Sequence, residues 1–273
     1  MSAACLLRWN FLASDHGGHG RARRHLFQCR SLQGQLQESC RACQSSGLAG
    51  RLACDMDMSK RYQVSGPEGE FEPDSNGQVL RNLVGIASPD DMDELELRLL
   101  GELYDEVLVQ SLPERPLTVA DLKRWHQLWL GNVYAWAGRE RSVNLGKGGF
   151  QFATASLLPG LLRDFERQYL ARWTPCSRLG ADELVHAVAV THVELIVIHP
   201  FREGNGRLSR LLADVMAVQA GHEPLDYSSW EQRKSAYIGA IHAGFSGDYC
   251  PMVGFVTEAM AAGEAGKNTD EIN

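Results

Sequence analysis

Apolar residues recur at helical spacing in several segments of the chain. Ser88 and Pro89 open one of these segments, and an apolar stripe follows at Met92, Leu95, Leu99, Leu103 and Val107. This pattern predicts an amphipathic helix that is capped by Ser88. Thr118 opens a second such segment with an apolar stripe at Leu122, Trp125 and Trp129, and the periodicity recurs over 157–170 and 207–220. We therefore predict a mostly helical domain with the tryptophans in its core.

The segment 181–198 is apolar on nearly every side at helical spacing. A helix of this kind is buried, so the pattern predicts a central helix in the core of a bundle. Pro200 lacks an amide N–H and disfavours helical angles at the residue before it. The helix must therefore end near His199, which places a polar ring at the mouth of the core.

The periodicity changes between residues 142 and 153. Two short runs of β-type residues flank the sequence Gly146-Lys147-Gly148-Gly149, which is a turn signal between strands. An isolated hairpin is only marginally stable in water. We expect a β-hairpin that packs on the helices or takes part in function.

Composition and charge limit the classes of partner. The 273 residues are 44% hydrophobic and carry a formal net charge of -7, which argues against general affinity for nucleic acid or anionic lipid. No run reaches the roughly 18 uncharged apolar residues of a membrane span. We expect no nucleic acid and no membrane partner.

Residues 1–54 differ from the rest of the chain. They hold seven arginines, no lysine and two acidic residues, about +5, together with five of the seven cysteines. Cys40 and Cys43, with Cys29 or His25, are a weak candidate for a zinc site, and an Arg-rich targeting peptide is an alternative. We favour an unstructured or spurious extension over 1–57, followed by an extended lead-in over 58–87, the folded domain over 88–258 and a flexible tail over 259–273.

The stretch "HPFREGNGRLSR" has the composition of an anion site. Gly204 and Gly206 allow main-chain amides to converge on a ligand, and the helix that follows offers its positive N-terminal end. Arg207 and Arg210 lie on the same side of that helix. Phosphates are the predicted ligands, and Glu203 is a candidate for holding Mg²⁺ against phosphate oxygens.

The whole stretch resembles the signature of the Fic family, His-Pro-Phe-x-acidic-Gly-Asn-Gly-Arg-x-x-Arg, at every specified position. The likeness extends to "LWLGNVYAWAG", "RSVNLGKGGFQFA" and "SAYIGAIHAGFSGDYCPM", and covers about residues 59–255. It implies an all-α Fic fold with a β-hairpin flap over the active site. It also implies the transfer of AMP from ATP to a Ser, Thr or Tyr hydroxyl of a target protein, with release of pyrophosphate.

The resemblance also assigns roles to residues. His199 would be the general base, Glu203 would hold Mg²⁺, and Phe201 would anchor the loop in the core. The phosphates of ATP would be bound by Gly204, Asn205, Gly206, Arg207 and Arg210, with Asn205 on the α-phosphate. The flap, with Lys147, Gly148, Gly149 and Phe150, would pair with the backbone of the target.

Other functions remain open. One is a non-catalytic ATP-binding interaction protein, and another is a Fic enzyme that transfers a different nucleotide or a phosphate group. Doc-type members carry Lys where Gly206 stands and transfer phosphate, so Gly206 favours AMP. His192 and Glu194 match the H-x-E of zinc deaminases, but no Pro-Cys-x-x-Cys follows.

Regulation and location follow from the resemblance as expectations. The inhibitory Fic pattern Ser/Thr-x-x-x-Glu-Gly/Asn finds no match in the sequence, and "SGPEG" at 65–69 is one residue too short. The chain thus resembles the toxin class, in which a small antitoxin supplies an inhibitory Glu and topoisomerase ATPase subunits are candidate targets. Two cysteines after residue 54 are too few for a disulfide framework, so we expect the bacterial cytoplasm, with a secreted effector as the alternative.

Overall fold

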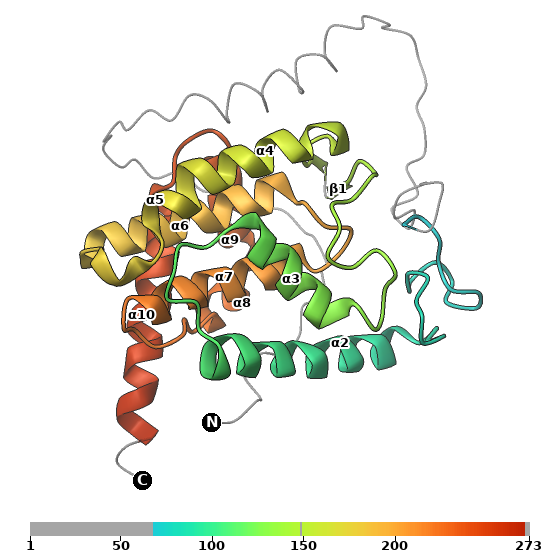
Figure 1. Cartoon of the computed structure of the whole chain (residues 1–273), viewed down its shortest axis with the longest axis horizontal. Helices are drawn as coiled ribbons and strands as arrows, with labels where there is room; N and C mark the ends of the chain where they lie inside the picture. Colours follow the sequence, from blue (N-terminus) through green and yellow to red (C-terminus); the bar gives the residue numbers. More distant parts are fainter. Residues whose placement is uncertain (1–67, 148, 271–273) are drawn as a thin grey trace, which may run out of the picture.

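The computed structural model describes residues 68–147 and 149–270, with side chains as far as residue 265. Helices dominate this part of the chain (Figure 1). The predictions for 1–57, including the zinc site at Cys40 and Cys43, lie outside the described residues. In chain order the elements are α2 (Pro89–Tyr104), η2 (Asp105–Gln110), α3 (Val119–Leu130), β1 (Gly146–Lys147), β2 (Phe150–Gln151), η3 (Ala155–Leu157), α4 (Leu158–Phe165), η4 (Glu166–Leu170), α5 (Ala171–Trp173), η5 (Cys176–Arg178), α6 (Ala181–Ile198), α7 (Asn205–Gln219), α8 (Ser228–Gln232), α9 (Lys234–Phe245) and α10 (Cys250–Asp270).

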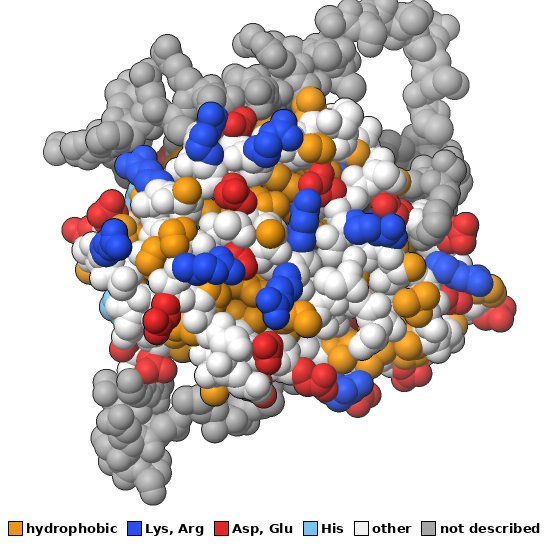
Figure 2. Space-filling model, in the orientation of Figure 1, with side chains coloured by type: hydrophobic (Ala, Val, Ile, Leu, Met, Phe, Trp, Pro, Cys, Tyr) orange, Lys and Arg blue, Asp and Glu red, His pale blue; other side chains and the backbone are white. Residues whose placement is uncertain are grey.

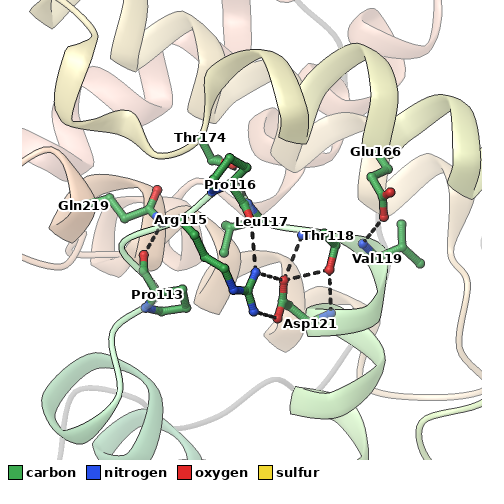
Figure 3. A network of polar contacts seen from close by, with 10 residues as sticks. All are labelled: Pro113, Arg115, Pro116, Leu117, Thr118, Val119, Asp121, Glu166, Thr174 and Gln219. Atoms are coloured by element: carbon green, nitrogen blue, oxygen red, sulfur yellow. Dashed lines mark hydrogen bonds and ion pairs between the residues drawn. The ribbon is translucent and has the colours of Figure 1, made fainter.

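The predicted helix starts are confirmed. The Ser88 hydroxyl accepts a hydrogen bond from the N–H of Asp91 at the start of α2. Thr118 and Asp121 form a reciprocal capping box at the start of α3, and Arg115 binds both oxygens of the Asp121 carboxylate, at 2.8 and 2.6 Å (Figure 3). Such side-chain acceptors satisfy main-chain N–H groups that have no partner inside the helix.

Side chains from distant segments tie down the connection between α2 and α3 (Figure 3). Glu166 accepts a hydrogen bond from the N–H of Val119 at 2.6 Å, and the Thr174 hydroxyl accepts one from Leu117 at 2.7 Å. These bonds hold α3 against the segment that contains α4, η4 and α5, so the start of α3 is fixed from two sides.

The central position of α6 is confirmed. Thirteen of its eighteen residues are buried, and it packs against α4, α7, α9 and α10 (Figure 1). An apolar surface that runs round the whole helix has no other stable location in water. The last residue of α6, Ile198, is fully buried, so the C-terminal end of this helix is fixed by the core.

The hairpin is also confirmed. Strands β1 and β2 are antiparallel, with Gly146 opposite Gln151 and Lys147 opposite Phe150. The N–H of Phe152 donates to the carbonyl of Leu145 at 3.0 Å, which continues the pairing beyond the two short strands.

The C-terminal segment differs from the expected flexible tail over 259–273, because α10 continues to Asp270. Ala259 and Met260 are buried, and the carboxylate of Glu264 lies 3.0 Å from Nδ1 of His222. The apolar spacing that begins at Met252 continues as far as Met260, so α10 packs on the domain beyond residue 258. Within the described chain, no helix combines the length and the apolar character that a bilayer crossing requires.

Candidate active site

His199 ends α6 in a left-handed conformation, with φ of 52° and ψ of 60°. Its N–H donates to the carbonyl of Leu195 at 3.0 Å and closes the last turn of the helix. A left-handed residue other than Gly costs roughly 1–2 kcal/mol. The packed core and a hydrogen bond from Nε of Arg141 to the carbonyl of His199 stabilise this conformation, which turns the chain abruptly away from the helix axis.

The imidazole of His199 is held in one tautomer. Nδ1 lies 3.1 Å from the carbonyl oxygen of Ile196, and because a carbonyl only accepts, Nδ1 carries the proton and Nε2 is left as an acceptor. Phe152 stacks on the ring, with centroids 3.7 Å apart and planes 11° apart. Burial, together with the charges of Arg141 and Lys147, lowers the pKa of His199 to about 4, so the ring is neutral at pH 7.

The loop after His199 is closed by Asn205. Its side-chain oxygen accepts a hydrogen bond from the N–H of Phe201 at 2.9 Å, and its amide nitrogen donates to the carbonyl of Phe201 at 2.8 Å. Asn205 is only 2% exposed. Both polar atoms of the side chain therefore bind the loop, and the expected contact of Asn205 with the α-phosphate stays a prediction.

The two glycines of the loop have different surroundings. Gly204 has φ of +80°, and a Cβ there would lie 2.6 Å from Cζ3 of Trp129. A Cβ on Gly206 would have no atom within 4 Å, so there is open space above the start of α7. No acceptor among the described residues binds the N–H of Asn205, Gly206 or Arg207, which leaves three donors at a positive helix end.

Glu203 lies beside these donors with a half-exposed carboxylate. One oxygen accepts a hydrogen bond from the N–H of Gly204 at 3.1 Å, and Arg207 lies 3.9 Å away. Partial desolvation raises the pKa of Glu203, but Arg207, this N–H and Lys147 outweigh it and hold the pKa below its usual range. The carboxylate is therefore ionised and can bind a cation.

Arg207 is fixed by an acidic residue of α2. Its guanidinium lies 2.7 Å from the carboxylate of Glu96, which is buried, and 4.5 Å above the ring of Trp129. The sequence predicts Arg207 as a phosphate ligand, and the structure places it at the start of α7 with 30% of its side chain exposed.

Arg210 lies one turn further along α7 and packs on aromatic rings. It lies 4.9 Å from the ring centroid of Tyr227 and 6.0 Å from that of Trp230. Its Nη1 is 3.5 Å from the carboxylate of Glu231 in α8. A carboxylate of the chain itself therefore faces the second arginine of the motif, and the sequence gives no sign of this contact.

Comparison with known proteins agrees with this geometry. The model of the Fic/DOC family matches residues 116–217. Residues 116–217 are therefore identified as a Fic/DOC domain.

Two curated relatives illustrate the range of this family. The probable protein adenylyltransferase y4lH of Sinorhizobium fredii is 29% identical over 174 residues, which is 64% of this chain and 87% of the relative. The protein adenylyltransferase Fic of Drosophila ananassae is 31% identical over 165 residues, which is 60% of this chain and 31% of the relative. The matched region is thus most of the first relative and less than a third of the second.

The Fic fold is shown by solved structures as well. The BepC protein of Bartonella tribocorum, a VirB-translocated effector whose structure contains bound AMPPNP, matches with a TM-score of 0.54 and 22% sequence identity. The match covers 66% of this chain and 91% of that chain. At this identity the comparison supports the fold alone.

The flap of this Fic domain packs against α9. The ring of Phe150 stacks on His242 with centroids 5.1 Å apart and meets the edge of Phe245 at 5.4 Å. Lys147 and Gly149 are exposed, and Gly149 has φ of +81°. The fourth predicted flap residue, Gly148, lies outside the described residues.

His126 is a buried histidine that supports the loop between His199 and α7. Nε2 lies 3.1 Å from the carbonyl of Glu203, Nδ1 accepts a hydrogen bond from the N–H of Gly138 at 2.8 Å, and the ring stacks on Phe201 with centroids 4.0 Å apart. Burial lowers its pKa to about 4. Because Nδ1 accepts, Nε2 carries the proton and donates to the loop.

The supporting roles of His126, Glu96 and Arg141 do not follow from the sequence. A polar side chain inside an apolar helical stripe is the one signal that marks His126 and Glu96 in the sequence. The guanidinium of Arg141 donates to the carbonyl of His199 at 2.7 Å. These two residues are 58 positions apart, so local sequence patterns cannot predict their contact.

Proposed function

We propose that this chain transfers AMP from ATP to a hydroxyl group of a target protein and releases pyrophosphate. One observation carries the proposal: within nine residues, the chain presents a neutral histidine with Nε2 as acceptor and three N–H groups of α7 without an acceptor among the described residues. A base beside an anion site is what attack on a phosphate ester requires. The curated relatives named above are adenylyltransferases, which supports the same chemistry.

The proposed reaction is a displacement at the α-phosphorus. The target oxygen bonds to this phosphorus, its proton passes to Nε2 of His199, and the bond from the phosphorus to the bridging oxygen breaks. Pyrophosphate leaves with the electron pair of that bond. The three N–H groups of α7 and the charges of Arg207 and Arg210 would stabilise the phosphate oxygens as charge develops.

Glu203 fits a role in holding Mg²⁺. Its carboxylate is ionised and half exposed, and Mg²⁺ commonly takes one or two protein carboxylates together with substrate phosphates and water. No group of three or more potential metal-ligating side chains occurs among the described residues, so the phosphates of ATP would supply the remaining contacts. When bound, the ion would neutralise charge on the phosphates.

The test uses ATP labelled at the α-phosphate, bacterial lysate and the purified chain. We expect labelled protein with the wild type, none with His199→Ala, and unchanged labelling with His186→Ala, an exposed histidine on the same helix. Calorimetry with AMPPNP should show that His199→Ala still binds nucleotide, because the imidazole acts on the hydroxyl. Label from the γ-phosphate would instead identify a phosphotransferase, and binding of AMPPNP without any transfer would identify an interaction protein.

We further propose that the chain acts as the toxin of a toxin–antitoxin pair in the bacterial cytoplasm. Glu231 supports this, because its approach to Arg210 shows that the site accommodates a carboxylate, and an antitoxin Glu would occupy the same place. Expression of the full chain should slow growth, and His199→Ala should relieve it. Topoisomerase ATPase subunits are the first targets to test, and growth inhibition that survives His199→Ala would contradict the proposal.

A further inference from the structure

Arg141 lies between the flap and the end of α6, and it is 2% exposed. Its Nε donates to the carbonyl of His199 at 2.7 Å. Its two terminal nitrogens donate to the carbonyls of Val143 and Ala153, and one of them also lies 3.4 Å from the carbonyl of Ile198. One buried guanidinium thus binds four main-chain carbonyls.

These carbonyls belong to three separate pieces of chain. Val143 precedes β1 and Ala153 follows β2, so Arg141 joins the two legs of the flap. Ile198 and His199 form the end of α6, where carbonyls lack helical N–H partners and a positive charge is favourable. The bond to the carbonyl of His199 also stabilises that residue in its left-handed conformation.

Two further contacts join the flap to the base. The N–H of Arg141 donates to the carbonyl of Pro200 at 2.9 Å, and the N–H of Ala153 lies 3.4 Å from the carbonyl of Val197. Phe152, which stacks on the imidazole of His199, comes directly before Ala153 in the flap leg that Arg141 holds. Movement of this leg therefore shifts the ring that covers the base.

We propose that Arg141 is a positioning residue for AMP transfer, which fixes the two flap legs and the His199 turn relative to one another. This inference rests on the proposed function. A hydroxyl delivered along the flap meets Nε2 of His199 only if these pieces keep one arrangement. Arginine suits the role because its planar fork offers five donors at fixed angles and stays protonated, whereas the ammonium of lysine is a point charge.

The test compares Arg141→Lys and Arg141→Met with Arg139→Lys and Arg139→Met, two matched changes at an exposed arginine two residues away. Nitrogen-15 spectra of the imidazole report the His199 tautomer without any substrate. We expect Arg141→Lys to fold and to bind AMPPNP like the wild type. The His199 signals should change from one tautomer to a mixture, and labelling from α-labelled ATP should slow by about 100-fold, as a misplaced reacting group does.

Both Arg139 variants should match the wild type. A folded Arg141→Lys variant with wild-type imidazole spectra and labelling rate overturns the proposal. If neither Arg141 variant folds, Phe152→Leu decides, because this ring joins the flap leg that Arg141 holds to the imidazole: unchanged spectra and rate in Phe152→Leu would reject the inference. If the wild type transfers no AMP, the proposed function fails, and the imidazole spectra still show whether Arg141 fixes His199.

Discussion

The carboxylate of Glu96 in α2 lies 2.7 Å from the guanidinium of Arg207 in α7, and the Glu96 side chain is 5% exposed. The hydroxyl of Tyr134 donates to its other oxygen at 2.8 Å. A buried carboxylate with two strong partners orients the guanidinium before any nucleotide arrives. The first motif arginine is therefore part of the α2–α7 contact as well as of the candidate active site.

Replacing Glu96 with Gln should lower the free energy of unfolding by about 3 kcal/mol, because Arg207 loses the partner that offsets its desolvation. Urea unfolding measures the change. The control is Glu102→Gln on the same helix, where the carboxylate pairs with Arg98 and both side chains are about 60% exposed. That change should cost less than about 1 kcal/mol, and equal losses in the two variants would contradict the structural role of Glu96.

Glu231 gives the second prediction. Glu231→Gln removes a carboxylate that competes with phosphate for Arg210, so affinity for AMPPNP should rise, by up to about fivefold for a partly exposed pair worth at most ~1 kcal/mol. Calorimetry measures it, and Glu258→Gln, at an exposed pair with Arg233, is the control. Weaker binding by Glu231→Gln would instead mean that Glu231 holds Arg210 in place for the nucleotide.

The two loop glycines should respond differently to alanine. Gly204→Ala places a Cβ against Trp129 and strains a left-handed residue, so it should lower the free energy of unfolding by about 2 kcal/mol or more. Gly206→Ala meets open space and should leave stability unchanged, while its methyl group obstructs the N–H groups of α7 and weakens AMPPNP binding. Unfolding and calorimetry on both variants separate the two effects, and equal stability of the two variants would be inconsistent with the loop geometry.

A fourth prediction concerns pH. Burial raises the pKa of Glu194 to about 7, although the hydroxyl of Tyr249 donates to this carboxylate and opposes the shift. In the unfolded chain the group ionises near pH 4.5, so between pH 4.5 and 7 the folded protein keeps a proton that the unfolded chain releases. The contribution of Glu194 to stability is therefore complete below pH 4.5 and is lost as the pH rises through 7.

Glu194→Gln should become steadily more stable relative to the wild type over this pH range. The relative gain is about 1.4 kcal/mol for each unit of pKa shift, and therefore up to ~3 kcal/mol. Urea unfolding at several pH values measures it, with Glu183→Gln at the exposed start of α6 as control. If the difference in unfolding free energy between the wild type and Glu194→Gln stays constant from pH 4 to 8, the pKa of Glu194 is not raised.

Local patterns predict those parts of the fold that depend on neighbouring residues. The caps at Ser88 and Thr118, the buried α6 and its end before Pro200 each follow from the chemistry of a few adjacent side chains. The left-handed conformation of His199 and the tautomer of its ring depend on the last turn of α6 and on the flap, and no sequence spacing encodes them. The continuation of α10 beyond residue 258 does not follow from local pattern, because its small residues are typical of a tail and only their packing partners identify them as part of the core.

The candidate site shows the same division. The motif itself is read directly from twelve consecutive residues, 199–210. Glu96, His126 and Arg141 contact the site from segments far away in the sequence and cannot be found in this way. Asn205 is the instructive case, because an amide in a phosphate loop suggests a ligand contact, yet its hydrogen bonds to Phe201 shape the loop that presents the N–H groups.

The position of α6 has a consequence for thermal inactivation. Because this helix contacts four others and ends at His199, the backbone at the end of α6 is lost only when the core melts as one cooperative unit. The flap has two strands of two residues each and opens at a lower free energy. Warming should therefore release the flap, and with it the Phe152 ring over His199, while α6 is still folded, so AMP transfer should fall below the temperature of the global transition.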